Sequence, residues 1–290
     1  MITKNPAAPG PGVRTLACAG HRLVLDRTRV MGILNLTPDS FSDGGRWLER
    51  DAAVEHALAM QEAGADIIDV GGESTRPGAQ TITVQQELDR VLPVIETLAP
   101  QLSVPLSIDT GKPEVMRAAV AAGAGMINDV YALRQDGALQ AAVEIGVPVC
   151  LMHMLGNPRV MQNDPVYDDV AGEVAAFLLE RAVLCESNGI ARENIVLDPG
   201  FGFGKTLGQN IDLFRAIPDI AAMGYPLLVG VSRKSMLGHL TGRQTGDRVA
   251  ASVAAAVLAA QMGAAIVRVH DVGETRDALE VATALWQGWA

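Results

Sequence analysis

Polar and charged residues follow nearly every short apolar run in this chain, and they fall into two chemical sets. Asp109, Asn128 and Asp198 offer two carboxylates and an amide, which suit a flat heterocycle that presents amino and ring N–H donors. The second set is cationic or can become so, and it comprises Arg76, Lys234, Arg268 and His270 beside Ser74 and Thr75. Because Arg and Lys bind phosphate groups, the sequence predicts a site that holds a nitrogen-rich ring at one side and a phosphate or diphosphate at the other.

Each of these residues, taken alone, also has a structural explanation. Asp and Asn cap helices and begin turns, and for a single residue that role is the commoner one. Arg76 and Arg233 are explained as well by a solvated surface charge as by a bound anion. However, Asp, Asn, Lys, Arg and His recur after the apolar runs where Ser or Thr would suffice as caps. The recurrence favours a functional role for the set.

The apolar runs are short enough to be strands that are buried on both faces, as in a parallel sheet. They cover residues 30–34, 67–70, 106–108, 126–127, 147–152, 195–197, 227–231 and 266–269. The segments between them predict helices over residues 51–63, 84–98, 113–122, 138–145, 167–187 and 275–286. Gly follows several of these segments, at the position typical of a helix C-cap. The chain therefore repeats a strand–helix unit.

Eight parallel strands in about 250 residues predict a (β/α)8 barrel, the TIM barrel. The alternative is an open doubly wound sheet, which usually has fewer strands and a glycine turn for phosphate after the first one. No linker-like change in composition divides the chain, so we expect one domain over residues 29–290. Residues 1–28 form an N-terminal extension that could add a strand or hairpin to cap the barrel. The chemistry of such barrels lies at the C-terminal strand ends, where Asn35, Asp69 and Asp109 stand.

The segment DPGFGFGKT, residues 198–206, looks like a nucleotide-binding loop but fits neither glycine motif. A P-loop here would need glycine in place of Pro199, and a GxGxxG pattern that starts at Gly200 fails at Lys205. We therefore expect a flexible loop that brings Gly202 and Phe203 against a ligand. No zinc motif is present either, because the five His are scattered and no CxxC pair occurs.

The composition excludes several other classes of protein. The formal net charge of −10 and a pI near 5.0 argue against a nucleic-acid-binding protein. The chain has three Cys, which are too few for a disulfide scaffold and fit a reducing cytoplasm. Residues 1–13 lack the apolar core of a secretory signal peptide. The uncharged, Ala-rich stretch between Arg248 and Arg268 predicts a buried helix that ends near residue 262, rather than a membrane span.

Longer motifs occur in a fixed order along the chain. They are MGILNLTPDSFSDGG (31–45), DVGGESTRPGA (69–79), SIDT (107–110), INDV (127–130), LDPGFGFGKT (197–206), VGVSRKS (229–235) and RVHDV (268–272). In these motifs the sequence resembles the dihydropteroate synthase family from about residue 29 to its C-terminus. The resemblance implies a (β/α)8 barrel and a transferase of folate biosynthesis. Such an enzyme joins 6-hydroxymethyl-7,8-dihydropterin pyrophosphate to p-aminobenzoate, releases pyrophosphate and forms 7,8-dihydropteroate.

The resemblance also implies roles for individual residues. The pterin-binding residues would be Asp109, Asn128, Met152, Asp198, Phe203 and Lys234. The pyrophosphate-binding residues would be Asn35, Thr75, Arg76, Arg268 and His270, with Asn35 on a Mg²⁺ cofactor. The aminobenzoate-binding residues would be Phe41, Thr75, Pro77, Lys234 and Ser235. The residues that act in catalysis would be Asp109, Asp198, Lys234 and Arg268.

These roles suggest a mechanism in which the electrophile does most of the work, because an arylamine is a weak nucleophile. The C–O bond to pyrophosphate would break first and leave a pterin methylene cation, which Asp109 and Asp198 would stabilise. Mg²⁺, Arg268 and His270 would stabilise the departing diphosphate. We expect the loops over residues 36–45 and 73–83 to order only around the ligand and to exclude water.

Two other functions remain open at this point. A pterin-binding barrel that handles a folate methyl group would keep the ring site but would need no residues for a diphosphate. A non-catalytic paralogue would bind a pterin or a partner protein without turnover. The motifs GESTRPG, VSRKS and RVH are all present, which favours the synthase. The resemblance further implies sulfonamide competition with aminobenzoate and a homodimer, for which the Ala-rich residues 249–260 are a candidate surface unless they pack in the core.

Overall fold

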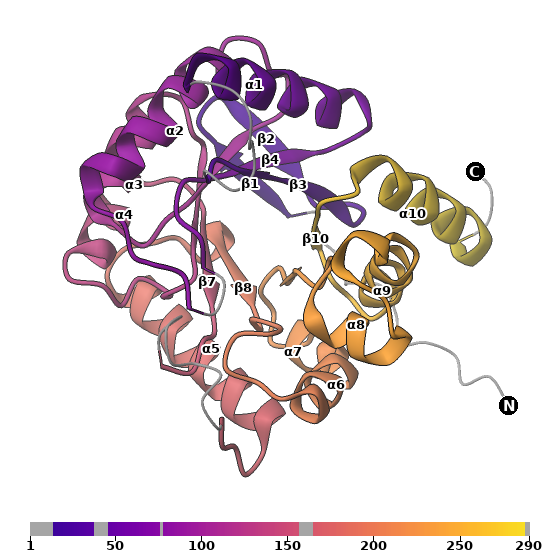
Figure 1. Ribbon diagram of the computed structural model, residues 1–290. Coiled ribbons are helices and arrows are strands. Elements are labelled where there is room, and N and C mark those ends of the chain that lie inside the picture. Colours follow the sequence, from indigo (N-terminus) through magenta and orange to yellow (C-terminus); the bar gives the residue numbers. More distant parts are fainter. Residues whose placement is uncertain (1–13, 38–45, 76–77, 157–164, 288–290) are drawn as a thin grey trace, which may run out of the picture.

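The computed structural model describes residues 14–37, 46–75, 78–156 and 165–287, and in these ranges the chain forms a closed parallel barrel (Figure 1). Its strands are β3 Arg29–Asn35, β4 Ile67–Gly71, β5 Leu106–Asp109, β6 Met126–Asp129, β7 Val149–Met152, β8 Ile195–Asp198, β9 Leu228–Val229 and β10 Ile266–Val269. They pair in the order β8-β7-β6-β5-β4-β3-β10-β9. A parallel bridge between Leu197 of β8 and Leu227, the residue before β9, brings the two ends of this order together. The predicted TIM barrel is confirmed.

Helices follow the strands and form the outer wall of the barrel (Figure 1). They are α1 Arg46–Glu62, α2 Val84–Leu98, α3 Pro113–Ala121, α4 Ala138–Ile145, α5 Val170–Ser187, α6 Leu207–Arg215, α7 Ile217–Ala221, α8 Ser235–Thr241, α9 Val249–Gln261 and α10 Val272–Gln287. The sequence pattern located α2 and α4 to the residue, but it did not indicate α6, α7 or α8. Helices α7 and α8 have five and seven residues, so a 3.6-residue period has few turns in which to show. Helix α6 has nine residues, as many as the predicted α3, so its length does not explain the omission.

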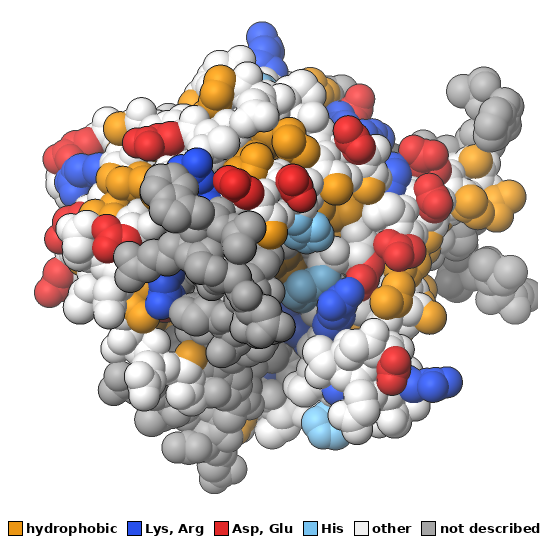
Figure 2. Space-filling model, turned by 45° about the horizontal axis from the view of Figure 1, so that its top comes forward, with side chains coloured by type: hydrophobic (Ala, Val, Ile, Leu, Met, Phe, Trp, Pro, Cys, Tyr) orange, Lys and Arg blue, Asp and Glu red, His pale blue; other side chains and the backbone are white. Residues whose placement is uncertain are grey.

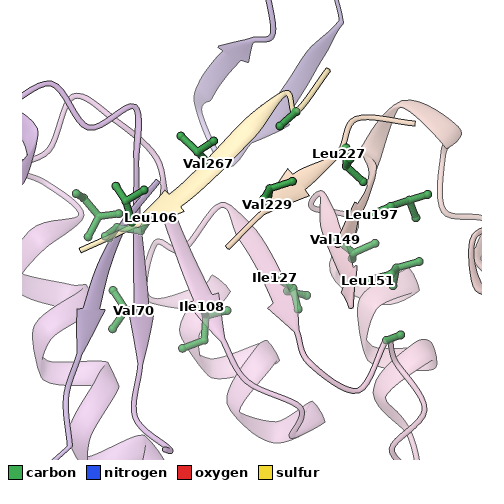
Figure 3. Close-up of a cluster of buried hydrophobic side chains, with 14 of the residues drawn as sticks. Val70, Leu106, Ile108, Ile127, Val149, Leu151, Leu197, Leu227, Val229 and Val267 are labelled. Atoms are coloured by element: carbon green, nitrogen blue, oxygen red, sulfur yellow. The ribbon is translucent and has the colours of Figure 1, made fainter. Parts of the chain in front are cut away.

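Alternate residues of each strand point to opposite faces, and the two faces build separate cores. Outward residues pack against the helices, as the labelled Val70, Ile108 and Ile127 do in Figure 3. Inward residues of the first half of the strands fill the barrel interior, and they include Met31, Ile67, Met126, Cys150, Val196, Leu228 and Ile266. The N-terminal half of the barrel is therefore a packed core.

A hairpin from the N-terminal extension completes that inner core. Strands β1 Thr15–Cys18 and β2 His21–Val24 pair antiparallel. Leu16, Cys18 and Leu23 are buried against the inward-facing residues of the barrel strands. A Cβ at Gly125 would lie 2.6 Å from the Cys18 carbonyl carbon, so only glycine lets the hairpin approach so closely. The hairpin closes the N-terminal end of the barrel and leaves its C-terminal end as the open one.

Helix α9 accounts for the Ala-rich, uncharged stretch of the sequence. Ser252, Ala255, Ala256 and Ala259 are buried, whereas Leu258 is 51% exposed. The segment therefore packs in the core with one face and leaves another face outside. Among the described residues, no helix is long and apolar enough to span a membrane.

Candidate functional site

The predicted site residues that belong to barrel strands form one layer inside the C-terminal half of the barrel. Because side chains alternate along a strand, the residue two positions after each inward-facing core residue also points inward. Ile67 is followed in this way by Asp69, Met126 by Asn128, Cys150 by Met152, Val196 by Asp198 and Ile266 by Arg268. The apolar core thus ends in a layer of polar side chains. Figure 2 shows Lys, Arg and His side chains around a hollow in one face of the molecule.

Arg268 binds two carboxylates in this layer. Its Nε donates to Asp69 Oδ2 over 2.6 Å, and its Nη2 donates to Asp109 Oδ2 over 2.8 Å. Asn128 Nδ2 donates to the same Asp69 oxygen over 3.0 Å. Asp69 is fully buried, and its Oδ1 has no partner among the described residues. A buried carboxylate oxygen without a donor is costly, so this atom is a candidate contact for a ligand N–H or O–H group.

The electrostatics of this cluster depend on burial. Desolvation raises the pKa of Asp109 to about 7, although Arg268 opposes the rise and Asp69 adds to it. Burial works against the charge of Arg268, but Asp69 and Asp109 outweigh it and raise the pKa of the guanidinium. The cluster therefore holds a permanent positive charge between one deeply buried carboxylate and one that can titrate near neutral pH.

Asp198 and Lys234 make the second pair of opposite charges in the layer. Asp198 Oδ1 accepts the Gly200 amide over 2.7 Å, and burial raises the pKa of this carboxyl while Lys234 lowers it. Lys234 Nζ donates to the Phe201 carbonyl over 2.5 Å and lies 4.7 Å from the centre of the Phe203 ring. Burial lowers the pKa of Lys234 to about 8, against the opposing effect of Asp198. Met152 and Phe203 pack in one small apolar cluster beside these groups.

The layer differs from the two-sided site that the sequence suggested. By residue type, Arg268 belongs with the phosphate-binding cations and Asp109 with the ring-binding acceptors. The folded chain joins them in a salt bridge, because β10, β3, β4 and β5 are consecutive neighbours around the barrel. Asp69, which had no assigned role, is the residue that anchors Arg268. The signal for it was available, since Asp69 is the only charged residue of a strand that is buried throughout.

The loops after β9 and β10 are tied together at the rim. His270 Nδ1 lies 3.0 Å from Ser232 Oγ, and the His270 amide donates to the same hydroxyl oxygen. Arg233 adopts a left-handed conformation with φ of 57° and pairs with Asp271. This strained residue stands directly before Lys234 and turns the chain into α8. Ser235, the first residue of α8, is exposed at the same rim.

The loop after β4 is pinned at both ends of its described part. Glu73 Oε1 accepts the Ile82 amide over 3.0 Å, and Glu73 Oε2 lies 2.6 Å from Lys112 Nζ. Lys112 also pairs with the fully buried Glu87 over 2.5 Å. Thr75 is half-buried between these anchors. Sequence reasoning missed Glu73, which belongs to the motif over 69–79, and Lys112, which lies two positions after the motif SIDT. Three predicted site residues, Phe41, Arg76 and Pro77, lie outside the described residues, as does most of the loop over 36–45.

The loop after β8 is not the flexible segment that the sequence suggested. Asn210 Oδ1 accepts the Gly202 amide, and Asn210 Nδ2 donates to the carbonyls of Lys205 and Thr206. The Tyr167 hydroxyl donates to the Gly204 carbonyl over 2.9 Å. The prediction of flexibility is therefore wrong, because glycines gave only the backbone freedom while buried side chains elsewhere fix the shape.

Comparison with known proteins identifies the family. The family model described as pterin binding enzyme matches residues 31–270. The dihydropteroate synthase of Escherichia coli strain K12 is 52% identical over 269 residues, which cover 93% of this chain and 95% of the relative. The chain belongs to the dihydropteroate synthase family.

Solved structures of dihydropteroate synthases agree with this assignment. The Xanthomonas albilineans enzyme with 4-aminobenzoic acid has a TM-score of 0.91 and 55% identity, covering 96% of this chain and all of that one. The Yersinia pestis enzyme in complex with a sulfonamide drug has a TM-score of 0.90 and 49% identity, covering 94% and 99%. The family membership, the barrel and the expected transferase of folate synthesis are confirmed. The alternative of a methyl-handling barrel is not supported by these matches.

The residues present fit the Mg²⁺ that the family resemblance implies. A Cβ at Gly71 would lie 3.8 Å from both Asn35 Oδ1 and Asp109 Oδ2, so these oxygens flank the same narrow space. Oxygen atoms are the ligands that Mg²⁺ prefers, and this ion usually takes one or two from the protein and the rest from water and substrate phosphates. No group of three His, Cys, Asp or Glu among the described residues could enclose a metal. A single protein ligand such as Asn35 suits an ion that arrives with a diphosphate.

Proposed function

We propose that this chain carries out the dihydropteroate synthase reaction in the polar layer at the C-terminal end of the barrel. Asp109, Asn128, Asp198 and Lys234 hold the pterin ring, with Met152 and Phe203 as its apolar walls. The observation that carries the assignment is the pairing of Arg268, which is 19% exposed, with the fully buried Asp69 and with Asp109 in this layer. Residues 29–290 act as the catalytic domain, and the preceding hairpin closes its far end.

Bond breaking at the pterin methylene carbon is the step that the layer favours. As the C–O bond to diphosphate lengthens, positive charge develops on the pterin and spreads into its ring. Asp198 is 7% exposed, so its charge acts there through a medium from which water is largely excluded. Asp109 lies in the same layer and adds a second carboxylate. The amine of aminobenzoate then attacks the cation, and the anilinium that forms loses its proton without a strong base.

The leaving diphosphate needs cations at the rim. Arg268 lies in β10 and His270 directly follows that strand, and Thr75 and Arg76 belong to the loop that Glu73 and Lys112 anchor. Asn35 would hold the Mg²⁺ ion, which when bound neutralises part of the diphosphate charge. Arg268 is already held by Asp69, so its orientation is fixed before the substrate arrives.

The aminobenzoate would bind outside the pterin, at the mouth of the site. Ser235 is exposed at the start of α8, and Lys234 connects it to the pterin pocket. Thr75, with Phe41 and Pro77, would complete the aminobenzoate site from the loops. Because the Yersinia pestis enzyme was solved with a sulfonamide drug, we expect sulfonamides to compete with aminobenzoate here.

Turnover by the purified chain tests this function. The chain is incubated with 6-hydroxymethyl-7,8-dihydropterin pyrophosphate, p-aminobenzoate and Mg²⁺, and 7,8-dihydropteroate is measured. Formation of product that requires both substrates supports the proposal. Absence of product would refute it, and pterin binding without turnover would point to the non-catalytic paralogue.

Two finer assignments belong to the same proposal. Leu240 on α8 and Leu258 on α9 are 58% and 51% exposed, and the two helices contact each other. We place the homodimer interface on this face. Sedimentation of the wild-type chain should give a dimer, and Leu258→Asp should give a monomer; a monomeric wild type would refute the placement.

The three cysteines are free and buried, which fits a cytoplasmic location.

A further inference from the structure

One buried cation takes no part in the mechanism above. Lys205 is only 3% exposed, and it lies in the glycine-rich segment after β8 that resembles a nucleotide loop without fitting its motif. Its Nζ lies 2.9 Å from the Gly200 carbonyl, 3.1 Å from the Phe203 carbonyl and 3.0 Å from His153 Nδ1. An ammonium group has three N–H donors. Each donor therefore has one acceptor, and no carboxylate or water is needed to satisfy the group.

The loop is wrapped around this ammonium group. Gly200, Gly202 and Gly204 all have positive φ, at 69°, 79° and 64°. At Gly200 a Cβ would lie 1.9 Å from the His153 carbonyl oxygen, so only glycine allows this close approach. In a phosphate-binding loop the backbone N–H groups point inward at an anion. Here carbonyl oxygens point inward at a cation that the loop itself supplies.

The groups that the loop presents to the site depend on this arrangement. The Gly200 amide donates to Asp198 Oδ1 over 2.7 Å. Phe203 follows three residues later, packs against Met152 and carries Lys234 Nζ over its ring. Lys205 holds the carbonyl groups of both Gly200 and Phe203. The segment over residues 200–203 joins Asp198 to the ring of Phe203. Without the ammonium group of Lys205, both ends of this segment would lose a hydrogen bond.

We propose that Lys205 is a positioning residue of the pterin site, which fixes the loop over residues 200–204 around its own charge and places a third positive charge behind Asp198. This inference rests on the function proposed above and deepens it, since it concerns the pterin rather than the aminobenzoate. His153 is the partner that makes the arrangement possible. Burial and the nearby Lys205 charge lower the pKa of His153 to about 3, so its ring is neutral and Nδ1 can accept.

The charge of Lys205 acts on Asp198 together with other groups. Those that face this carboxylate are Lys234, Arg268 and Lys205 as cations and Cys150 as a buried thiol. Burial lowers the pKa of Lys205 to about 7, so its cation persists below that pH. Each cation favours ionised Asp198. Removing Lys205 must therefore move the ionisation of Asp198 to higher pH.

Lys205→Met tests the proposal, because it keeps the length of the side chain and removes the charge and the donors. We expect the KM for the pterin pyrophosphate to rise about ten- to a hundredfold, while the KM for aminobenzoate is unchanged. The acid limb of kcat/KM should move to higher pH. Backbone amides in the segment over 199–206 should exchange hydrogen faster. Lys205→Arg should keep the position of the acid limb, since it keeps the charge.

Arg215→Met is the matched control, because Arg215 ends the helix that follows this loop and is 75% exposed. It should change none of these readouts. If Lys205→Met raised both KM values equally, or left the acid limb in place, Lys205 would be an ordinary structural residue and the proposal would fail.

A second pair of variants covers the case in which Lys205→Met does not fold. His153→Asn keeps an acceptor near the Nδ1 position, whereas His153→Leu removes it. Only His153→Leu should raise the pterin KM and the exchange of the loop amides, and equal effects of the two would overturn the proposal. Hydrogen exchange needs no turnover. An inactive wild-type chain would therefore refute the proposed function, whereas unchanged exchange in the variants would refute the role of Lys205.

Discussion

Replacing Arg268 by Met should destabilise the chain by leaving two carboxylates without their shared cation. Asp69 is fully buried and Asp109 is nearly so, with 13% of its side chain exposed. Removing one partner of a buried ion pair typically costs about 3–5 kcal/mol. In a chain of this size each kcal/mol lowers Tm by about 2 °C. We therefore expect Tm to fall by about 6–10 °C near neutral pH.

The loss should also depend on pH in a predictable direction. The pKa of Asp109 in the folded chain is about 7, whereas an exposed Asp has a pKa of about 3.9. The folded state thus keeps a proton that the unfolded state has released, and stability falls as pH rises between about 4 and 7. Arg268 lowers the pKa of Asp109, so without Arg268 the pKa of Asp109 in the folded chain is higher still. In the Arg268→Met variant the free energy of unfolding therefore continues to fall above pH 7, by up to about 1.4 kcal/mol per pH unit.

Thermal unfolding of four chains measures both effects: the wild type, Arg268→Met, Asp69→Asn and the double variant. Between about pH 6 and pH 9 the gap between wild type and Arg268→Met should widen with pH. Asp69→Asn should restore much of the lost stability in the double variant, because it removes one of the two stranded charges. Arg117→Met serves as control, since its partner Glu144 is on the surface, and its Tm should match the wild type. A gap that stays constant with pH would refute the electrostatic explanation.

Three further predictions concern activity. Asp198→Asn keeps an acceptor for the Gly200 amide but removes the charge, so kcat in single-turnover measurements should fall about 10²–10³-fold while Tm changes little; an unchanged kcat would remove Asp198 from the mechanism. Because the pKa of Lys234 is about 8, kcat/KM for the pterin substrate should decrease as pH rises through that value, and Lys234→Arg should abolish that alkaline limb. Glu73→Gln weakens the anchor of the loop that carries Thr75, so it should lower kcat and raise the KM for aminobenzoate but leave pterin binding as in the wild type; a selective loss of pterin binding would contradict this role.

The sequence was informative wherever one physical rule decides the outcome. Apolar runs separated by amphipathic segments can bury one face of a parallel sheet against helices and the other inside a barrel, and the eight predicted strands all occur. Side-chain alternation then fixes which residues point inward. Once Ile67 and Val196 lie in the barrel core, Asp69 and Asp198 must lie in the layer above it. The candidate residues at the strand ends therefore share one layer in the structure.

The partners of these residues could not be predicted in the same way. Arg268 and Asp109 are 159 positions apart in the chain, and only the closure of the barrel brings β10 within reach of β4 and β5. The loop after β8 was misjudged for a related reason. Its glycines are visible in the sequence, but Asn210, Tyr167 and His153, which fix its shape, come from other segments. Conformational freedom of a segment is a local property, whereas its order in the fold depends on distant contacts.

The charges of the layer explain why so many ionised groups can lie inside a barrel whose chain has a net charge of −10. The carboxylates of Asp69, Asp109 and Asp198 are matched by the cations of Lys205, Lys234 and Arg268. The layer is thus close to neutral before any ligand binds, and each charge lies near an opposite one, which limits the cost of burial. A pterin ring adds no net charge, but a diphosphate adds several negative charges that this balanced set cannot neutralise. We expect the missing positive charge to come from Arg76 at the rim and from an ion that enters with the substrate. This balance is a physical reason to expect Mg²⁺ beside Asn35, at the diphosphate rather than at the ring.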